Sequence, residues 1–361
     1  MIQYKIAVLG GDGIGPEVVA ASLDVLRAVE SLLEGIGFTF EHHDVGAGEY
    51  LKNGHPMPPA TVAKFKTADA ILLGAMGLPE VRWPNGVEMT PQIDIREQLD
   101  LYNGLRPIRL YHESHTPLKG FGGAGHPIDL VLVRENCEGL FVDRLTPRPP
   151  GREFETDTLR ITRHGAERIS RAAFELARKR RHHVTLVDKA NVLPSMAFFR
   201  RVFDEVAREY PDVQCDHIYV DAMALFLVQR PQDFDVIVTE NMFGDILSDL
   251  AAGLVGGMGM APSADLGDTY GLFQPSHGTA PTIAGKGIAN PIGTILSAAL
   301  MLDWLGHPQT VRGARMIERA VATALANPAH RTADLGGTFG TADMTACIIA
   351  NLDSSIPCLA S

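Results

Sequence analysis

Short apolar runs that are typical of buried strands alternate along this chain with amphipathic segments of helical period. The strand-like runs are residues 5–9, 70–73, 130–133, 184–187 and 235–239, and the helix-like segments are residues 16–34, 167–181, 194–209, 291–304 and 310–327. This alternation predicts an α/β fold in which helices cover the faces of a sheet. At 361 residues, the chain has room for one large or two medium domains.

Polar side chains of the kind used in catalysis recur where the expected strands end. Arg134, Lys189, Asp221 and Asn241 all stand just after such runs. In α/β folds, ligands bind at the carboxyl ends of the strands. The sequence therefore predicts that the functional site lies at that edge of the sheet.

Two carboxylates, Asp245 and Asp249, are spaced four residues apart, which places them on one side of a helix, one turn from each other. Ile246, Leu247 and Leu250 give the same helix an apolar side. Paired hard oxygen ligands suit Mg²⁺ or Mn²⁺. Spacing alone favours an exposed acidic helix face over a metal site, and both interpretations stay open at this point.

The glycine-rich loop of residues 10–16 follows a strand and precedes a helix, but it does not match the dinucleotide fingerprint G-x-G-x-x-G. Counted from Gly11, the third glycine falls on Pro16. No Gly-Lys-Ser/Thr follows, which excludes a Walker loop. A turn beside a ligand and a purely structural turn are both open. A second loop of small residues, 277–287, would let a flat or phosphorylated ligand approach the backbone.

Composition excludes several classes of function. The net charge of −11 argues against nonspecific nucleic-acid binding, and no apolar run approaches the ~20 residues of a membrane span. The basic run 178–183 ends a helical segment, where cations favour the helix dipole. The four cysteines are scattered without metal-ligand spacing, which is typical of a cytoplasmic protein.

These motifs occur together in one family. The chain resembles the isocitrate/3-isopropylmalate dehydrogenases, metal-dependent β-decarboxylating enzymes that include tartrate and D-malate dehydrogenases. The segments that carry the resemblance are 11–17, 188–192, 219–223, 241–249, 277–291 and 334–337. It implies a two-domain fold with a mixed sheet flanked by helices, distinct from the Rossmann fold. The first domain would comprise residues 1–101 and 256–361, and the second, with the dimer interface, residues 102–255. It also implies a homodimer with a shared active site.

The resemblance assigns roles to individual residues. Arg96, Arg106 and Arg134 match the arginines that bind the substrate carboxylates, and a guanidinium fork suits that task. Asp221, Asp245 and Asp249 match the ligands of Mg²⁺ or Mn²⁺. Lys189 matches the lysine that removes the hydroxyl proton, with Asp221 as its catalytic neighbour.

The resemblance also implies a cofactor site. The residues that match the adenosine-binding loop are His277, Gly278, Thr279, Ala280, Thr282, Ile283 and Asn290. Asn191 and the turn of residues 11–17 would lie near the nicotinamide, and Asn191 near the substrate. Thr282 stands where NAD-type members carry aspartate and NADP-type members lysine. Threonine cannot neutralise a 2′-phosphate, so we expect NAD, with NADP as the open alternative.

Two further departures concern the substrate. The family usually has tyrosine, which is thought to protonate the carbon left by decarboxylation, where this chain has Phe141. Thr90 and Gln92 occupy the substrate-selecting segment, where isopropylmalate enzymes have leucines. A polar pocket disfavours an alkyl group, because buried polar groups would lose their partners. Asp94 is unexpected there, since its carboxylate would repel an acidic substrate.

The resulting prediction is an NAD- and Mg²⁺/Mn²⁺-dependent dehydrogenase of a malate-type (R)-2-hydroxy diacid, isopropylmalate-dehydrogenase-like and decarboxylating. A tartrate, D-malate or isocitrate-type dehydrogenase is the alternative within the family. A non-catalytic regulatory paralogue is the alternative from another class, and NAD reduction by the purified chain would separate the two.

Overall fold

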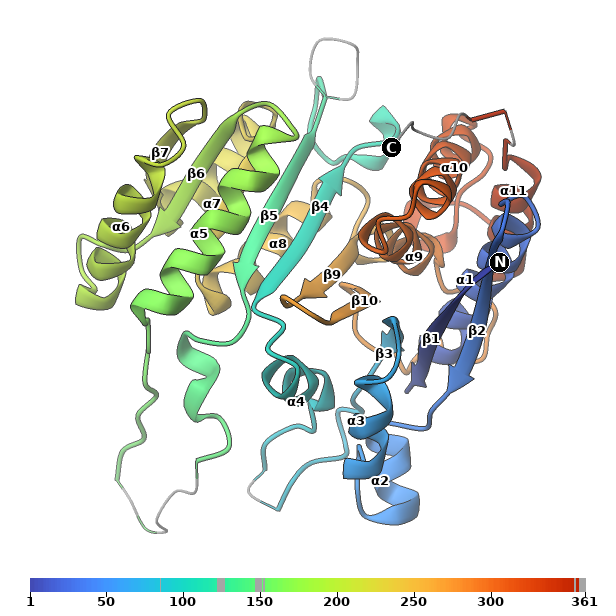
Figure 1. Cartoon of the computed structure of the whole chain (residues 1–361), viewed down its shortest axis with the longest axis horizontal. Coiled ribbons are helices and arrows are strands. Elements are labelled where there is room, and N and C mark those ends of the chain that lie inside the picture. The colour runs from blue at the N-terminus through green and yellow to red at the C-terminus, as the bar shows by residue number, and fades with distance from the viewer. Residues whose placement is uncertain (85, 122–126, 147–150, 152, 354, 357–361) are drawn as a thin grey trace.

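A single mixed sheet forms the centre of the molecule (Figure 1). The computed structural model describes residues 1–361 except 85, 122–126, 147–150, 152, 354 and 357–361. The strands are β1 (Ile2–Gly11), β2 (Ile36–His42), β3 (Ala70–Ala75), β4 (Asn103–Arg109), β5 (Asp129–Glu135), β6 (His183–Asp188), β7 (Gln214–Tyr219), β8 (Val236–Thr239), β9 (Pro262–Leu266) and β10 (Gly271–Pro275). Their order across the sheet is β2-β1-β3-β10-β9-β4-β5-β8-β6-β7.

The two halves of the sheet differ in where they come from along the chain. Strands β2, β1, β3, β10 and β9 come from the two ends of the chain, and β4, β5, β8, β6 and β7 come from its middle. Neighbours within each outer part run parallel, whereas β10, β9, β4 and β5 pair antiparallel at the centre. The predicted mixed sheet is thus confirmed.

Helices cover both faces of this sheet. The main helices are α1 (Gly15–Glu30), α2 (Ala47–Asn53), α3 (Pro59–Phe65), α4 (Pro91–Gln98), α5 (Arg163–Arg178), α6 (Pro194–Ala207), α7 (Val220–Gln229), α8 (Asn241–Gly253), α9 (Ile292–Trp304), α10 (Pro308–Ala326) and α11 (Thr341–Ala350). Short 3-10 helices span η1 (Glu113–His115), η2 (Leu140–Asp143), η3 (Pro231–Asp233), η4 (Met258–Met260) and η5 (Ala333–Leu335). One core lies among β1, β3, α1, α9 and α10, and another among β5, β8, β6, α5 and α6.

Alternating side chains explain why the middle strands need helices on both faces. Along β5, Val131 and Val133 pack with α5 and α6, while Leu130 and Leu132 pack on the other face with α7 and α8. Every one of these side chains is at most 6% exposed. A strand buried on both faces reads as a continuous apolar run, which is why the sequence predicted these strands.

The structure also corrects some predicted bounds. The first helix was expected over residues 16–34 but ends at Glu30. A turn follows, and Gly35, with φ of +68°, leads into β2 and accepts a hydrogen bond from the Ile2 amide. Strand β4 escaped prediction because it contains polar residues and Pro107. Proline is unusual inside a strand, so its pattern gave no strand signal.

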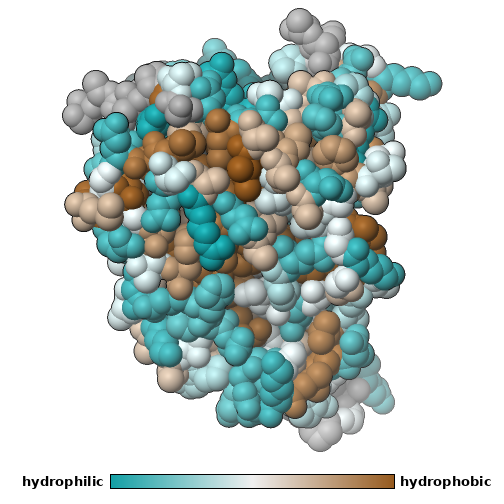
Figure 2. All heavy atoms as spheres, turned by 90° about the vertical axis from the view of Figure 1, so that its right-hand side faces the viewer, coloured by the Kyte–Doolittle hydropathy of each residue, from teal (hydrophilic) through white to brown (hydrophobic). Residues whose placement is uncertain are grey.

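No helix in the described part of the chain is long and apolar enough to cross a membrane. Figure 2 shows one side of the molecule, on which hydrophobic residues form separate patches between hydrophilic ones. The cysteines Cys137, Cys215 and Cys347 are free thiols, and Cys358 lies outside the described residues.

A buried histidine gives a prediction for the pH dependence of stability. His115 is 6% exposed, and neither ring nitrogen has a hydrogen-bond partner among the described residues. Burial, with the nearby His112 and Arg331, lowers the pKa of His115 to about 4, against the opposing charge of Asp334. The unfolded chain therefore takes up this proton first, and stability is lost as the pH falls from about 6.5 towards 4.

We expect His115→Leu to remove part of this loss. Between pH 7.5 and pH 5, the fall in the free energy of unfolding should become smaller by roughly 1–2 kcal/mol. Urea unfolding at both pH values measures the difference. The exposed His55 provides the matched control, because His55→Leu should leave the pH dependence unchanged. An equal fall in the wild type and in His115→Leu would show that His115 is not responsible.

Candidate functional site

Three arginines predicted to bind substrate line one cavity of about 290 Å³. Arg96 comes from α4, Arg106 from β4 and Arg134 from β5. Each is at most 6% exposed. Nη1 of Arg106 has no hydrogen-bond partner, which leaves a buried cationic donor available for an anion in this cavity. The structure thus brings together the three arginines at the edge where the sequence predicted a site.

Asp265 of β9, which the sequence analysis missed, holds two of these arginines in place. Its carboxylate is fully buried, accepts a hydrogen bond from Arg96 Nε at 2.9 Å, and lies 3.8 Å from Arg106 Nη2. Asn136 and Gln274 also donate to it, at 2.8 and 2.7 Å. Burial opposes the ionised form, but the two guanidinium charges outweigh it and lower the pKa of Asp265 overall. No sequence signal pointed to this role, because Asp265 lies in a short segment, Pro262–Leu266, that has no apolar run around it.

Arg134 connects the cavity to helix α8. Its Nε and Nη2 donate to Oδ1 of Asn241 at 2.9 and 2.7 Å, and Nη1 pairs with Asp245. Burial lowers the pKa of Arg134 to about 10, partly offset by the charge of Asp245. Gly244 allows the Arg134 side chain to pack directly against helix α8, because a Cβ at this position would lie 2.7 Å from Arg134 Cγ. The Phe141 ring lines the same cavity, with its centre 5.7 Å from the Arg134 guanidinium.

The substrate-selecting segment also reaches this cavity. Thr90 and Gln92 line it, and Oε1 of Gln92 is buried without a hydrogen-bond partner. Asp94 does not line it. Its carboxylate pairs with Arg144 at 2.5 Å, and Arg144 also pairs with Glu97. The expected repulsion between Asp94 and an acidic substrate is therefore compensated by a neighbouring arginine.

The two carboxylates on α8 fit the binding of a divalent cation. The Glu240 side chain caps this helix by accepting from the amides of Met242 and Phe243. Asp245 lines the cavity, and Asp249 follows one turn later. Burial, and then the charge of Asp245, raise the pKa of Asp249. A carboxylate whose ionisation is disfavoured in this way is stabilised by a hard cation, and Asp245 and Asp249 together offer oxygen ligands for one.

The remaining predicted catalytic residues lie elsewhere in the single chain. Lys189, after β6, and Asp221, in the first turn of α7, form an ion pair of 2.8 Å, but neither lines the substrate cavity. Asn191 is exposed and does not line it either. Among the described residues of one chain, no three His, Cys, Asp or Glu side chains are placed to hold a metal ion. One subunit alone therefore does not bring Asp221 to Asp245 and Asp249.

A second cavity, of about 530 Å³, adjoins the first through His277, which lines both. Ile14, Met258, Ile283 and Ile288 give it apolar walls, and His277, Asn290 and Asp334 contribute polar groups. Burial lowers the pKa of His277, and its Nε2 has no hydrogen-bond partner in the described chain. A large cavity with apolar walls and a few polar groups suits a flat ligand such as an adenine base.

The two small-residue loops of the sequence meet beside this cavity. Gly13, with φ of +60°, packs so closely that a Cβ there would lie 2.0 Å from the Thr279 carbonyl oxygen. The Ile14 amide donates to that oxygen at 2.8 Å. Of the predicted cofactor residues, His277, Ala280, Ile283 and Asn290 line the cavity, Gly278 lines the substrate cavity, Thr279 is buried, and Thr282 is exposed.

Comparison with known proteins agrees with this geometry. The family model described as isocitrate/isopropylmalate dehydrogenase matches residues 5–348. The 3-isopropylmalate dehydrogenase of Aquifex aeolicus is 43% identical, with 98% of each chain covered, and that of Escherichia coli is 43% identical, with 92% of each covered. The crystal structure of isocitrate dehydrogenase from Methylococcus capsulatus superimposes with a TM-score of 0.86 at 37% identity, over 97% of this chain and 99% of that one. A β-decarboxylating dehydrogenase from Thermococcus kodakarensis gives 0.78 at 38% identity, over 97% and 96%.

Proposed function

Because the chain belongs to the isocitrate/isopropylmalate dehydrogenase family, and is therefore a decarboxylating hydroxy-acid dehydrogenase, we propose that it oxidises a malate-type (R)-2-hydroxy diacid with NAD and Mg²⁺ or Mn²⁺. The observation that carries this proposal is the convergence of Arg96, Arg106 and Arg134 on one cavity that also contains Asp245. Three buried guanidinium groups fit a substrate with two carboxylates, and the acidic pair beside them fits a cation.

In this proposal the arginines orient the substrate. Arg106 offers its free Nη1 to a carboxylate, and Arg96 and Arg134 hold the substrate from adjoining elements. Asp265 and Asn241 fix two of the guanidinium planes in advance, so little conformational freedom is lost on binding. The Gln92 amide oxygen favours a substrate with a hydrogen-bond donor, such as a hydroxyl, over one with an alkyl group.

Asp245 and Asp249 would hold the cation together with Asp221 of a second subunit. When bound, the cation supplies polarisation of the substrate's 2-oxygen. In its neutral amine form, Lys189 of that second subunit would accept the proton of the 2-hydroxyl group, and the ammonium group so formed would pair with Asp221, which lies 2.8 Å from it.

Exposed apolar side chains support a homodimer that shares its sites in this way. Leu225 and Val228 on α7 and Ile246 on α8 are 52%, 42% and 55% exposed. They lie on the same two helices as Asp221 and Asp245, which a single chain does not bring together. Burying them against a second copy would bring α7 of one subunit to α8 of the other. The proposed domain division, 1–101 with 256–361 and 102–255, assigns α7 and α8 to the second domain. We also propose a cytoplasmic location, which suits the free thiols.

The cavity of about 530 Å³ would bind the adenosine part of NAD, with His277 and Asn290 as its polar contacts. When bound, NAD supplies the acceptor for the hydride. His277 lines both cavities, so the nicotinamide end would reach the substrate from this side. NADP is disfavoured because Thr282 carries no positive charge for a 2′-phosphate.

Tartrate, D-malate and isocitrate-type substrates are the alternatives within the family. A regulatory subunit without turnover has less support, because the site arginines, Lys189 and the acidic residues are all present. The deciding experiment is a panel of 2-hydroxy diacids, including 3-isopropylmalate, with NAD or NADP and with Mn²⁺ or EDTA. We expect the protein to reduce NAD when a small polar diacid and Mn²⁺ are present. EDTA should abolish this reaction. NAD reduction that is fastest with 3-isopropylmalate would overturn the proposed substrate preference, and no reduction with any diacid would overturn the proposed activity.

Phe141 leads to a prediction about product partition. Its ring lies in the substrate cavity but has no proton to donate to the carbon left by CO₂. We expect Phe141→Tyr to raise CO₂ release relative to free keto acid by about tenfold or more, which is only part of the roughly 10²- to 10⁴-fold effect typical of a well-placed general acid. Parallel assays of reduced NAD, CO₂ and keto acid measure the partition. Phe141→Leu serves as the control that changes shape without adding an acid. An unchanged partition in Phe141→Tyr would show that another group donates this proton.

A further inference from the structure

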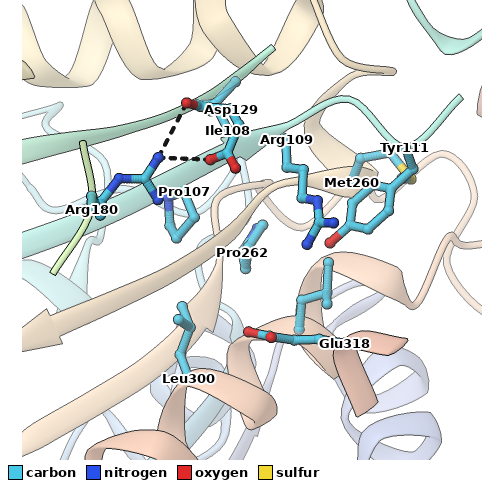
Figure 3. A pocket seen from close by; sticks show the side chains of 11 residues that line it. Pro107, Ile108, Arg109, Tyr111, Asp129, Arg180, Met260, Pro262, Leu300 and Glu318 are labelled. Carbon is cyan, nitrogen blue, oxygen red and sulfur yellow. Dashed lines mark hydrogen bonds and ion pairs between the residues drawn. The ribbon is translucent and has the colours of Figure 1, made fainter. Parts of the chain in front are cut away.

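A third cavity, of about 240 Å³, lies beside strands β4, β5 and β9 and shares no lining residue with the proposed substrate and cofactor cavities (Figure 3). Strand β4 separates it from the substrate cavity, since Arg106 lines one and the next residue, Pro107, lines the other. Successive residues of a strand point to opposite faces, which explains this division. The other walls come from β5, β9, η4, α9, α10 and the turn after α5.

One side of this cavity is apolar. Met260, Pro262, Leu296 and Leu300 line it, together with Pro107. At about 30 Å³ for each water-sized group, the volume accommodates roughly eight such groups. A small organic molecule with an aliphatic part fits this space, whereas a nucleotide does not.

The charged groups around the cavity divide into a paired and an unpaired set. Arg180 belongs to the paired set, since it donates to Asp129 Oδ1 at 2.7 Å and to Asp235 Oδ1 at 2.8 Å. By contrast, the Arg109 guanidinium and the Glu318 carboxylate have no hydrogen bond or ion pair with any described residue. Both residues are exposed, so water solvates their charges when the cavity is empty. Arg109 instead lies 5.2 Å from the centre of the Tyr111 ring. Figure 3 shows Arg109 and Tyr111 extending from one side of the hollow and Glu318 from the other.

The titration behaviour agrees with this geometry. Packing around the carboxyl group raises the pKa of Glu318, although the residue as a whole is exposed, and the carboxylates of Asp303 and Asp129 raise it further, against the charges of Arg109 and Arg315. This direction is expected for a carboxyl group without a close cationic partner. Burial likewise raises the pKa of Tyr111, so its hydroxyl stays protonated and can donate a hydrogen bond.

We propose that this cavity binds a free α-amino acid with an aliphatic side chain. Arg109 and the Tyr111 hydroxyl bind the carboxylate, Glu318 binds the ammonium group, and the side chain packs against Pro262 and Leu300. A diacid fits less well, because Glu318 and Asp129 would repel its second carboxylate. A fatty acid or an alkylamine would gain a charge-assisted hydrogen bond with only one of the two groups, whereas an α-amino acid gains both.

Calorimetric titration of the protein with valine, leucine and norleucine tests this site. We expect one binding event per subunit, with a Kd on the order of 1 mM or tighter. The matched probes 4-methylpentanoate, which lacks the amine, and 3-methylbutylamine, which lacks the acid, should bind at least about tenfold more weakly, as should aspartate.

Variants locate the binding event in this cavity. Arg109→Gln and Glu318→Gln should each weaken leucine binding by roughly 10- to 100-fold, as expected for the loss of a charge-assisted hydrogen bond. Glu34→Gln, at an exposed site away from the cavity, should leave it unchanged. If thermal unfolding shows that one of the two cavity variants does not fold, leucine binding by the other variant is enough to test the site. The proposal is overturned if no aliphatic amino acid binds at concentrations on the order of 10 mM, if both variants bind normally, or if 4-methylpentanoate binds as well as leucine.

Discussion

Mixed dimers of Lys189→Met and Asp245→Asn subunits are expected to regain activity that neither variant has alone. In the proposed shared site, Lys189 and Asp221 of one subunit act with Asp245 and Asp249 of the other. Each homodimer then has two defective sites, and its kcat should fall by about 10²- to 10⁴-fold. A mixed dimer has one doubly defective site and one intact site.

Co-expression of the two variants in equal amounts should therefore restore about a quarter of the wild-type activity, because half of the dimers are mixed and each has one of two sites intact. Two affinity tags allow the mixed dimer to be purified and its kcat measured. Asp245→Asn combined with Arg134→Lys is the matched control, because both residues belong to the same cavity and no intact site can form. A purified Lys189→Met/Asp245→Asn dimer as inactive as the control would contradict the shared site.

Removal of the Asp265 carboxylate should cost the most stability among the single changes considered. Asp265→Ala leaves Arg96 and Arg106 buried without their common counterion, since both lie within 4 Å of this carboxylate. Breaking a buried ion pair by removing one partner typically costs about 3–5 kcal/mol. We expect a loss of that size in the free energy of unfolding, measured with urea at neutral pH.

Two comparisons distinguish this effect from a general disturbance of the region. Asp268→Ala removes a nearby carboxylate whose only hydrogen bond among the described residues is a 3.3 Å contact from the Tyr102 hydroxyl, and it should cost about 1 kcal/mol or less. Asp265→Asn keeps the shape and part of the hydrogen bonding, so its loss should lie between the two. If Asp265→Ala costs no more than Asp268→Ala, the carboxylate does not hold the two arginines in place.

Much of the fold could be predicted because its signals are local. Apolar runs such as residues 130–133 and 184–187 are buried on both faces, so each strand shows its character within a few residues. Strands β7 and β9 gave no comparable signal. Strand β7 is exposed along most of its length, and β9 is short, with a buried aspartate among its residues.

Some features of the candidate site could likewise be predicted from local sequence, and others could not. The four-residue spacing of Asp245 and Asp249 is a property of any helix, so the sequence alone placed the two carboxylates on one side of α8. Neither spacing nor composition indicated that Asp265 would lie between Arg96 and Arg106. Those three residues come from β9, α4 and β4, and only the order of strands in the sheet brings them together.

The sequence by itself determined the α/β class and the spacing of the acidic pair, because periodicity and motif spacing act over a few residues. The three arginines were predicted as carboxylate-binding residues only through the family resemblance. Only the tertiary structure decided that Lys189 and Asp221 lie outside the cavity of their own chain, that Arg144 neutralises Asp94, and that a third cavity contains an unpaired Arg109 and Glu318. These relations depend on which strands become neighbours, and that choice is made by burial of the whole core.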